Sequence, residues 1–416
     1  MRSWVMILII SGLVLGLVGS VLAEPKLEFG GQMRFRGTYD DRDLNPANVT
    51  LKYSELRTRV HLQTELERNV IAYVQFQDSR VFGVDTSGAL NDKKNVDIHQ
   101  AYIQVDRLWH DGVGLRLGRF EVNIGNQRVF GAVDWSNIGR AWDGGMLWYD
   151  QLDFRLNGYW LKRLELNDTL ANRDFDITGL QAIFKDINLE LFGFYEHNAD
   201  NLNDARQTTR YNKLNRFNIG MYYYGVSEEI DYEVTAVYQS GDQSDPTAAT
   251  PVNIDISAVM LQGEVGYTFE ERDNNLRLAF GLDYTSGDDN PGDLTNNAYD
   301  NLYYTGHKFR GYMDYFVDSP TYGLLDVIFR AGFDPYPMWT VKGDMHFFKA
   351  AANYVDFMGN ETKKIGSELD LTAVTTSVPG IVLTGGASVF LPSEAFAGYN
   401  DPPAMYWAYL MAEVNF

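Results

Sequence analysis

The chain has no cysteine, a deficit of basic residues and a single long apolar run. Because none of its 416 residues is cysteine, it has no disulfide framework, no cysteine-ligated metal and no thiol nucleophile. Its 35 Lys and Arg residues face 56 Asp and Glu, a formal net charge of −21, which argues against a nucleic-acid partner. The only apolar run long enough for a membrane-spanning helix lies at the N-terminus, which excludes a helical membrane protein. With 45% hydrophobic and 14% aromatic residues, the chain is too apolar to be disordered.

Residues 1–23 have the features of a secretory signal peptide. Arg2 supplies a positive start, residues 5–18 are apolar, and Ala23 precedes Glu24 and Pro25 in the manner of a cleavage site. An uncleaved inner-membrane anchor is the alternative. Residues 24–416 then form a single exported domain, and an exported chain without cysteine fits a bacterial envelope.

Residues beyond the signal peptide alternate between apolar and polar side chains with a period of two, which predicts β-strands. Leu27, Phe29, Met33 and Phe35, for example, alternate with polar or small residues. Short connectors at 67–69, 108–112 and 334–337 alternate with long polar ones at 123–143, 287–321 and 349–363. A soluble sandwich has no reason to sort its connectors in this way.

This sorting predicts an all-β fold, a transmembrane antiparallel up-and-down β-barrel in the bacterial outer membrane. We expect about 18 strands, with 16 as the alternative, joined by short periplasmic turns and long extracellular loops. Only a closed barrel satisfies every backbone N–H and C=O group inside lipid. Outer-membrane lipid is therefore an expected partner.

The C-terminal residues alternate in the same way and stop at Phe416. This ending resembles the terminal-strand signal that the barrel-assembly machinery reads in bacterial outer-membrane proteins. The alternative is a chance aromatic residue at the end of an ordinary edge strand, although an exposed strand this apolar would be prone to aggregation. We therefore predict Phe416 as an assembly signal and the assembly machinery as a partner.

The polar face of each strand is expected to line the lumen. Two neighbouring strands would carry four arginines on one wall. A bulge at Gly118 and Arg119 is predicted because it would turn Arg116 and Arg119 inward and Phe120 outward. The expected pore-lining basic residues are Arg34, Arg36, Arg57, Arg59, Arg116, Arg119 and Arg155. The expected pore-lining acidic residues are Glu28, Glu55, Asp231, Glu233, Glu264, Asp283 and Asp344.

These charges have two interpretations. Arginines concentrated on early strands and carboxylates on later ones would create a transverse field that orients solutes in a constriction. Alternatively, the charges pair across strands and fill space. The four arginines of the first wall are the strongest candidates for contact with a solute.

No catalytic or metal-binding pattern is present. The six histidines, at positions 61, 99, 110, 197, 307 and 346, lack metal-ligand spacing, and we expect no metal, no other cofactor and no enzyme activity. Asp242, Asp245 and residues 288–290 could bind Ca²⁺, but acidic solvated loops are the favoured interpretation.

Several segments resemble the alginate-export family of outer-membrane porins. They are Arg57–Arg59 with Val74–Arg80, Asp97–Tyr102, Leu115–Arg119 with Gly125–Gly131 and Arg140–Gly144, and Thr305–Phe316. The resemblance implies an 18-stranded barrel through which a polymer or small solutes diffuse. In the alginate exporter the pore is strongly positive because its cargo is a polyuronate, and this chain departs from that pattern through its mixed lumen charge.

Residues 123–143 are predicted to fold back into the pore. This segment contains Arg128, Trp135, Arg140 and Trp142, and its apolar and aromatic residues need burial that an exposed loop lacks. An ordinary outer loop is the alternative. Residues 305–316 are similarly amphipathic and are expected to form a second plug element.

Two function classes remain from the sequence. The first is an outer-membrane porin for passive passage of small molecules or oligosaccharides, with sugar acids and polysaccharide-type anions as candidate solutes. The second is a non-transporting structural or binding barrel, such as an adhesin or a sheath for a periplasmic complex. The many lumen charges favour the porin, because they need water.

Overall fold

The computed structural model describes residues 26–45, 47–66, 69–83, 96–165, 174–198, 213–244, 252–269 and 274–416. The predicted signal peptide, residues 1–23, lies outside the described residues, as does Asp245.

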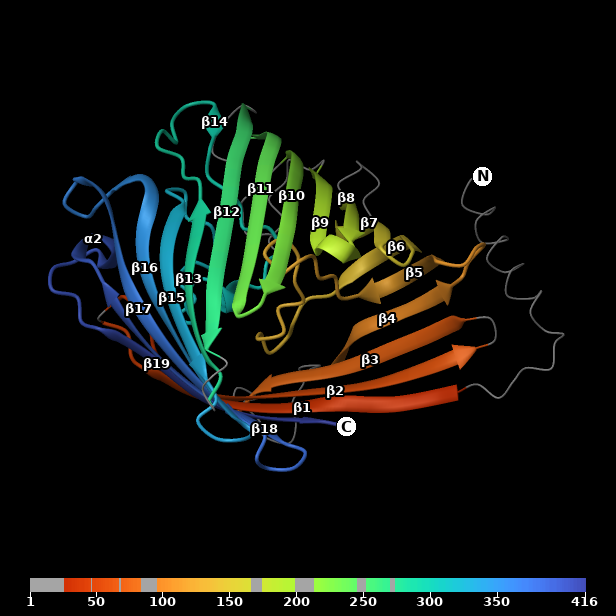
Figure 1. The fold of residues 1–416 in the computed structure, drawn as a ribbon. Helices are drawn as coiled ribbons and strands as arrows, with labels where there is room; N and C mark the ends of the chain where they lie inside the picture. Colours follow the sequence, from red (N-terminus) through yellow and green to blue (C-terminus); the bar gives the residue numbers. More distant parts are fainter. Residues whose placement is uncertain are drawn as a thin grey trace.

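The strands form one sheet that closes on itself, because the first strand pairs with both the second and the last (Figure 1). Of its 19 strands, β14 has two residues and pairs in parallel with β12, and the other 18 form an antiparallel wall. The predicted 18-stranded up-and-down barrel is therefore confirmed, and the alternative of 16 strands is wrong. The strands are β1 Lys26–Asp41, β2 Leu51–Leu66, β3 Val70–Val81, β4 Val96–Asp106, β5 Val113–Phe120, β6 Trp142–Asp150, β7 Phe154–Leu164, β8 Phe175–Phe184, β9 Leu189–Asn198, β10 Leu214–Ser227, β11 Ile230–Ser244, β12 Asn253–Phe269, β13 Leu276–Thr285, β14 Thr295–Asn296, β15 Leu324–Phe333, β16 Trp339–Val355, β17 Glu361–Thr375, β18 Val382–Pro392 and β19 Met405–Asn415.

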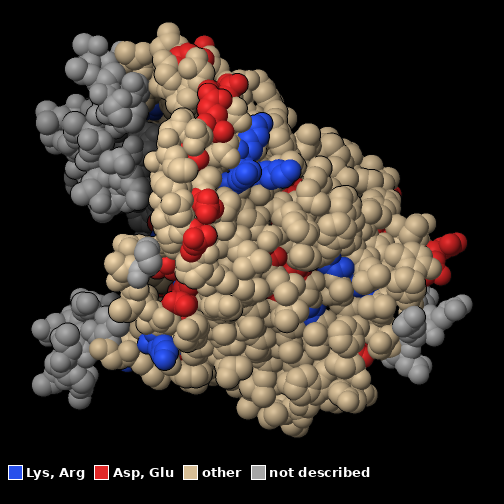
Figure 2. Space-filling model, turned by 90° about the vertical axis from the view of Figure 1, so that its left-hand side faces the viewer, with Lys and Arg blue, Asp and Glu red and all other residues tan. Residues whose placement is uncertain are grey.

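The alternation of the sequence becomes an outer apolar face and an inner polar face. On β1, Phe29 and Met33 are 64% and 46% exposed, whereas Arg34 and Arg36 are buried inside the barrel. Figure 2 shows one side of the molecule, on which uncharged residues cover broad areas and charged residues gather mainly along one strip. An apolar exterior is what lipid requires of a barrel wall.

The connectors largely follow the predicted sorting, with one correction. Between β16 and β17 a long loop at residues 349–363 was expected. Instead both strands continue past the expected ends, and only residues 356–360 connect them. The polar residues at the tip, such as Lys363, thus belong to a tall hairpin, because strand pairing beyond the membrane does not need apolar side chains.

The predicted bulge at Gly118 and Arg119 is wrong. The pairing of β5 with β4 and β6 continues through both residues without a shift of register. Phe120 faces inward and is 1% exposed, within an apolar cluster that fills part of the lumen. The sequence argument assumed that every apolar side chain on a strand faces lipid, and the inward-folded loops remove that requirement.

Helices are few and short among the described residues. They are the 3₁₀ turns η1 (Lys185–Ile187) and η2 (Gly306–Lys308) and the helix α2 (Glu394–Ala397). None of the helices in this part of the chain is long and apolar enough to cross a membrane.

Candidate functional site

Two long connectors meet inside the barrel and bond to each other. We call residues 121–141, between β5 and β6, the first inner loop, and residues 286–323, between β13 and β15, the second inner loop. The Gly131 N–H donates to the Tyr303 carbonyl at 2.9 Å, and the Tyr303 N–H donates to the Val129 carbonyl at 3.0 Å. A Cβ on Gly131 would lie 2.1 Å from Thr305 Oγ1, so only glycine permits this approach. The loops therefore form one composite plug, and the predicted inward folding of both is confirmed.

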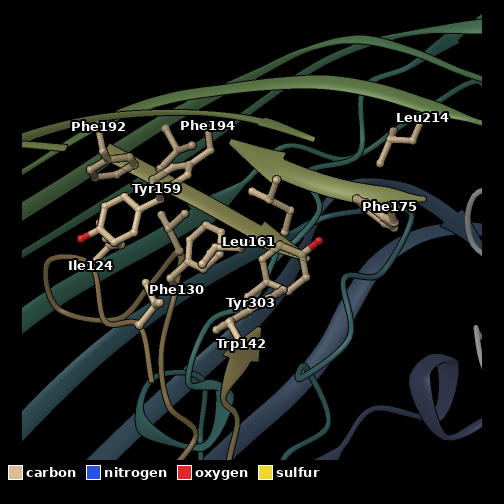
Figure 3. Close-up of a cluster of buried hydrophobic side chains, with 14 of the residues drawn as sticks. Ile124, Phe130, Trp142, Tyr159, Leu161, Phe175, Phe192, Phe194, Leu214 and Tyr303 are labelled. Carbon is tan, nitrogen blue, oxygen red and sulfur yellow. The ribbon is translucent and has the colours of Figure 1, made fainter. Parts of the chain in front are cut away.

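One side of the plug packs against the wall through aromatic rings (Figure 3). Phe130 and Tyr303, with ring centroids 5.0 Å apart, come from the two inner loops. Phe130 also lies 4.7 Å from Phe194 of β9, and the Trp142 ring meets Tyr303 edge-on. These side chains are at least 94% buried. Trp142, which we expected at the constriction, is thus part of the apolar core between the plug and the wall. Burying each large side chain of this core contributes about 1.5–3 kcal/mol to the stability of the fold.

The four arginines of the predicted basic wall come together as expected. Arg34 on β1 lies directly opposite Arg57 on β2 in the strand register. Arg34 donates to the carbonyls of Asp134, Trp135 and Ser136 at 2.6–3.0 Å. Arg57 donates to the carbonyls of Asp134 and Ser136 and, at 2.8 Å, to the Asp134 carboxylate.

The other two arginines of the wall, Arg59 and Arg36, also bind the first inner loop. Arg59 also bonds the Asp134 carboxylate, at 3.1 Å. Arg36 pairs with Glu55 and donates to the Trp135 carbonyl at 3.0 Å, and its guanidinium lies 4.2 Å from the centre of the Trp135 ring. Burial raises the pKa of Asp134, but Arg57, Arg59 and Arg34 outweigh it and hold this pKa below its usual value.

This arrangement corrects the role that we expected of the wall. Arg34, Arg36, Arg57 and Arg59 are 3%, 7%, 0% and 7% exposed, so they lie under the first inner loop rather than facing a solute. They satisfy carbonyl oxygens of a non-helical segment inside the barrel, where unpaired polar groups are costly. The sequence showed the positive wall but not the carbonyls that it binds.

Carboxylates on β13 and β17 hold the second inner loop. Asp283 on β13 pairs with Arg128 of the first inner loop and Arg310 of the second, at 2.5 and 3.1 Å. On β17, Glu368 accepts the Met313 N–H at 2.8 Å and Asp370 accepts the Tyr312 N–H at 3.2 Å. The predicted segregation of charge between the walls thus serves to hold the plug.

Residues that the sequence analysis did not select complete this second anchor. His346 on β16 bonds Asp326 on β15 at 2.7 Å and lies 3.8 Å from Asp370. Arg310 pairs with Asp283 from within the loop. The inward parity of Asp326 and His346 on their strands is the signal that could have identified them, whereas nothing in the sequence marks Arg310.

Three basic residues predicted to line the pore lie away from the plug anchors. Arg116 bonds Gln104 and covers the Tyr102 ring, and Arg155 bonds Asp150 and Asn157. Regular alternation places Arg119 on the opposite face from Arg116, where it pairs with Asp143 at 2.9 Å. The predicted inward turn of Arg119 is wrong, although its side chain reaches the rim of a cavity.

The predicted acidic residues fall into separate groups. Glu28 is half exposed and pairs with Lys26, and Glu55 pairs with Arg36. Asp283 anchors the plug. The remaining four, which lie together around a cavity on the periplasmic side, are Asp231, Glu233, Glu264 and Asp344.

Two polar cavities flank the plug. The outer vestibule, 430 Å³, lies at the extracellular ends of β5–β8 and β10. The inner vestibule, 510 Å³, lies at the periplasmic ends of β10–β13, β15 and β16. The outer lining carries five basic and three acidic side chains, which are Arg119, Arg140, Lys162, Arg163, Arg216, Asp143, Asp300 and Asp318.

Two guanidiniums of the outer vestibule stand out. Arg140 donates to the carbonyls of Tyr303 and Tyr304, and Arg163 donates to the Tyr303 hydroxyl at 3.1 Å. Neither forms an ion pair with a carboxylate among the described residues. Burial, with the charge of Arg163 beside it, lowers the pKa of Arg140 to about 10, so it remains a cation at neutral pH. An anion entering this cavity would meet both charges.

The candidate Ca²⁺ residues do not converge on a site in the described part of the chain. Asp242 lies on β11, and Asp288 accepts the Asn290 N–H at 3.0 Å within a turn. No group of three or more His, Asp or Glu side chains in the ranges given above could hold a metal ion.

Comparison with known proteins agrees with this architecture. The sequence model of the family described as "Alginate export" matches residues 25–402. No curated protein matches the sequence.

Solved structures show the same fold at low sequence identity. OccK9 (OpdG) of Pseudomonas aeruginosa is 12% identical, with a TM-score of 0.60 over 94% of this chain and 99% of that one. OpdK of Pseudomonas aeruginosa, solved with vanillate, is 10% identical, with a TM-score of 0.60 over 94% and 98%. A BenF-like porin from Pseudomonas fluorescens Pf-5 is also 10% identical, with the same score and coverage.

Proposed function

The chain belongs to the alginate export family of outer-membrane channels for small solutes, and we propose that its solutes carry a carboxylate and cross by passive diffusion. The observation that carries this proposal is the pair Arg140 and Arg163 in the outer vestibule, two guanidiniums with neutral partners. In a narrow, partly desolvated cavity such charges attract anions strongly. Guanidinium also offers a planar fork that fits a carboxylate.

The plug favours small solutes over a polymer. Both inner loops are bonded to each other and to separate sets of wall strands, and aromatic rings fill the space on one side. A polysaccharide chain could pass only if all of these contacts broke. OpdK, a protein with the same fold, was solved with vanillate, a small carboxylate.

We also propose that the chain is not an enzyme and that Phe416 is read by the barrel-assembly machinery. Both rest on the family and on the C-terminal pattern. In the closed barrel, Phe416 and Gly31 exchange backbone hydrogen bonds of 2.7 and 3.0 Å, and the two aromatic rings of Phe416 and Phe29 lie 6.1 Å apart. The signal residue thus also closes the seam between the first and last strands.

The test is ion selectivity in planar bilayers. The double variant Arg140→Gln with Arg163→Gln should shift the reversal potential in a KCl gradient toward cations and slow the passage of gluconate. The matched control is Arg107→Gln, which changes a half-exposed guanidinium on a periplasmic turn. The shift should shrink between about 0.1 M and about 1 M salt, because the Debye length falls from about 10 to about 3 Å.

Unchanged reversal potentials in the double variant would contradict the carboxylate preference. A folded, inserted barrel without unitary conductance would contradict the channel and favour the alternative, a non-transporting structural or binding barrel.

A further inference from the structure

The inner vestibule has a different chemical character from the outer one. It lies between the second inner loop and the periplasmic ends of the strands, and its 510 Å³ is within the range of small-molecule sites. Its aromatic lining comes from the wall and from the plug and comprises Tyr222, Tyr224, Tyr232, Phe309 and Tyr312.

Two of these rings form a platform on one strand. Tyr222 and Tyr224 point to the same side of β10, because they are two residues apart. Their ring centroids are 5.3 Å apart and their planes differ by 22°. Tyr222 is fixed by a hydrogen bond of 3.2 Å from its hydroxyl to Glu233, whereas Tyr224 is 42% exposed. Tyr224 therefore has surface open to the cavity that it lines.

A chain of alternating charges crosses the wall beside the platform. Asp231 on β11 pairs with Arg277 on β13, and Arg277 also pairs with Glu264 on β12 at 2.9 Å. Glu264 pairs with Arg330 on β15, and Arg330 lies 3.3 Å from Asp344 on β16. Each guanidinium lies between two carboxylates, unlike Arg140 and Arg163. The chain presents hydrogen-bond donors and acceptors without an uncompensated positive charge.

We propose that the inner vestibule is a binding subsite for a ring that carries several hydroxyl groups, such as a pyranose. The apolar C–H face of the ring packs on Tyr224 and Tyr222, and the hydroxyl groups around its edge bond to the alternating charges. A hydroxyl group both donates and accepts, so it matches a row in which carboxylates and guanidiniums alternate. A simple anion would meet three carboxylates and two guanidiniums in this row and would gain little.

The inference rests on the proposed function and extends it, because it assigns a binding subsite to a hydroxylated ring of a solute that also carries a carboxylate. A carboxylate would be met at the outer vestibule and a hydroxylated ring at the inner one. The two subsites can nevertheless be tested separately, since a neutral sugar engages only the inner subsite.

The test uses glucose as the probe and the full barrel in a planar bilayer. Glucose on the periplasmic side should cause reversible interruptions of the ion current in the wild-type channel. Tyr224→Ala should weaken the apparent glucose affinity about fivefold, which corresponds to about 1 kcal/mol, because the ring that packs on the sugar is lost. Tyr224→Phe should stay close to the wild type, since the ring face is retained.

Tyr238→Ala is the matched control, because Tyr238 is 46% exposed on the lipid face of β11. Raising the salt from about 0.1 M to about 1 M should leave the glucose affinity unchanged, because the recognising charges are already paired.

A conducting wild-type channel that is insensitive to glucose, or a Tyr224→Ala channel with wild-type affinity, would overturn the subsite and leave the proposed function intact. A wild-type channel that shows no preference for carboxylates but a normal glucose block would contradict only the proposed function. If the barrel does not conduct, calorimetry of glucose binding to the detergent-folded protein, with the same variants, decides the subsite.

Discussion

The indole of Trp135 lies flat on the imidazole of His307, with ring centroids 3.9 Å apart and 5° between the planes. The two residues belong to different inner loops, and eight wall strands, β6 to β13, lie between them in sequence. Around this stack, Arg36 covers the Trp135 ring and Asp314 bonds His307 at 3.0 Å. The stack joins the arginine-held loop to the carboxylate-held loop, and both rings also contact Trp407 on the wall strand β19.

Removing this stack should loosen the plug. In Trp135→Leu, the contacts with His307 and Arg36 are lost together, which corresponds to about 1–2 kcal/mol from aromatic and cation–π terms. We expect a noisier single-channel current with added larger conductance steps, and Trp135→Phe should show a smaller effect. A wild-type current in Trp135→Leu would show that the stack does not restrain the loops.

The buried arginine wall should act on plug position rather than directly on solute charge. Arg34→Gln with Arg57→Gln leaves several carbonyl oxygens of residues 134–136 without donors, and each unsatisfied group costs about 1–3 kcal/mol. We expect a larger mean conductance with frequent fluctuations, measured in planar bilayers. Arg155→Gln, which removes a guanidinium bonded to Asp150 and Asn157, is the control and should conduct as the wild type does. A stable conductance with changed selectivity would instead indicate direct contact with solute.

Gly311 should not accept a side chain. Its φ is +79°, and a Cβ there would lie 2.5 Å from a carboxylate oxygen of Glu368. Gly311→Ala should therefore displace the second inner loop and lower the temperature at which the barrel loses its heat-resistant mobility on gels. Gly359→Ala is the matched control, because Gly359 has a φ of +85° with nothing within 4 Å of the added Cβ. Gly359→Ala should lower the free energy of unfolding by only about 1 kcal/mol, because a side chain is unfavourable in this backbone conformation. Equal effects of the two substitutions would rule out the clash with Glu368.

Phe416 should matter for assembly and less for stability. Its ring is 56% exposed, so Phe416→Ala removes little buried area, and the backbone bonds to Gly31 remain. We expect lower levels of heat-modifiable protein in the outer membrane, with near-normal stability of the fraction that inserts. Phe416→Tyr keeps the aromatic ring and should assemble well. Normal insertion of Phe416→Ala would contradict a recognition role.

The barrel could be predicted from the sequence because its cause is local. A strand that crosses lipid must alternate, since successive side chains point to opposite faces, and the pattern at Phe29, Met33 and Arg34 is visible without any partner. Connector lengths then give the number of strands and their orientation. The meeting of Arg34 and Arg57 follows from two adjacent strands and was also predictable.

What those arginines do was decided only by the tertiary structure. The carbonyl oxygens of Asp134 and Ser136 bear no mark in the sequence, because every residue has one, and only the folded loop aims them at β1 and β2. In the same way, Phe120 was placed on the lipid side because its neighbours predicted an apolar exterior, whereas the loops create a second apolar environment inside the lumen. Periodicity reports which face of a strand a residue occupies, and the long-range contacts determine what that face meets.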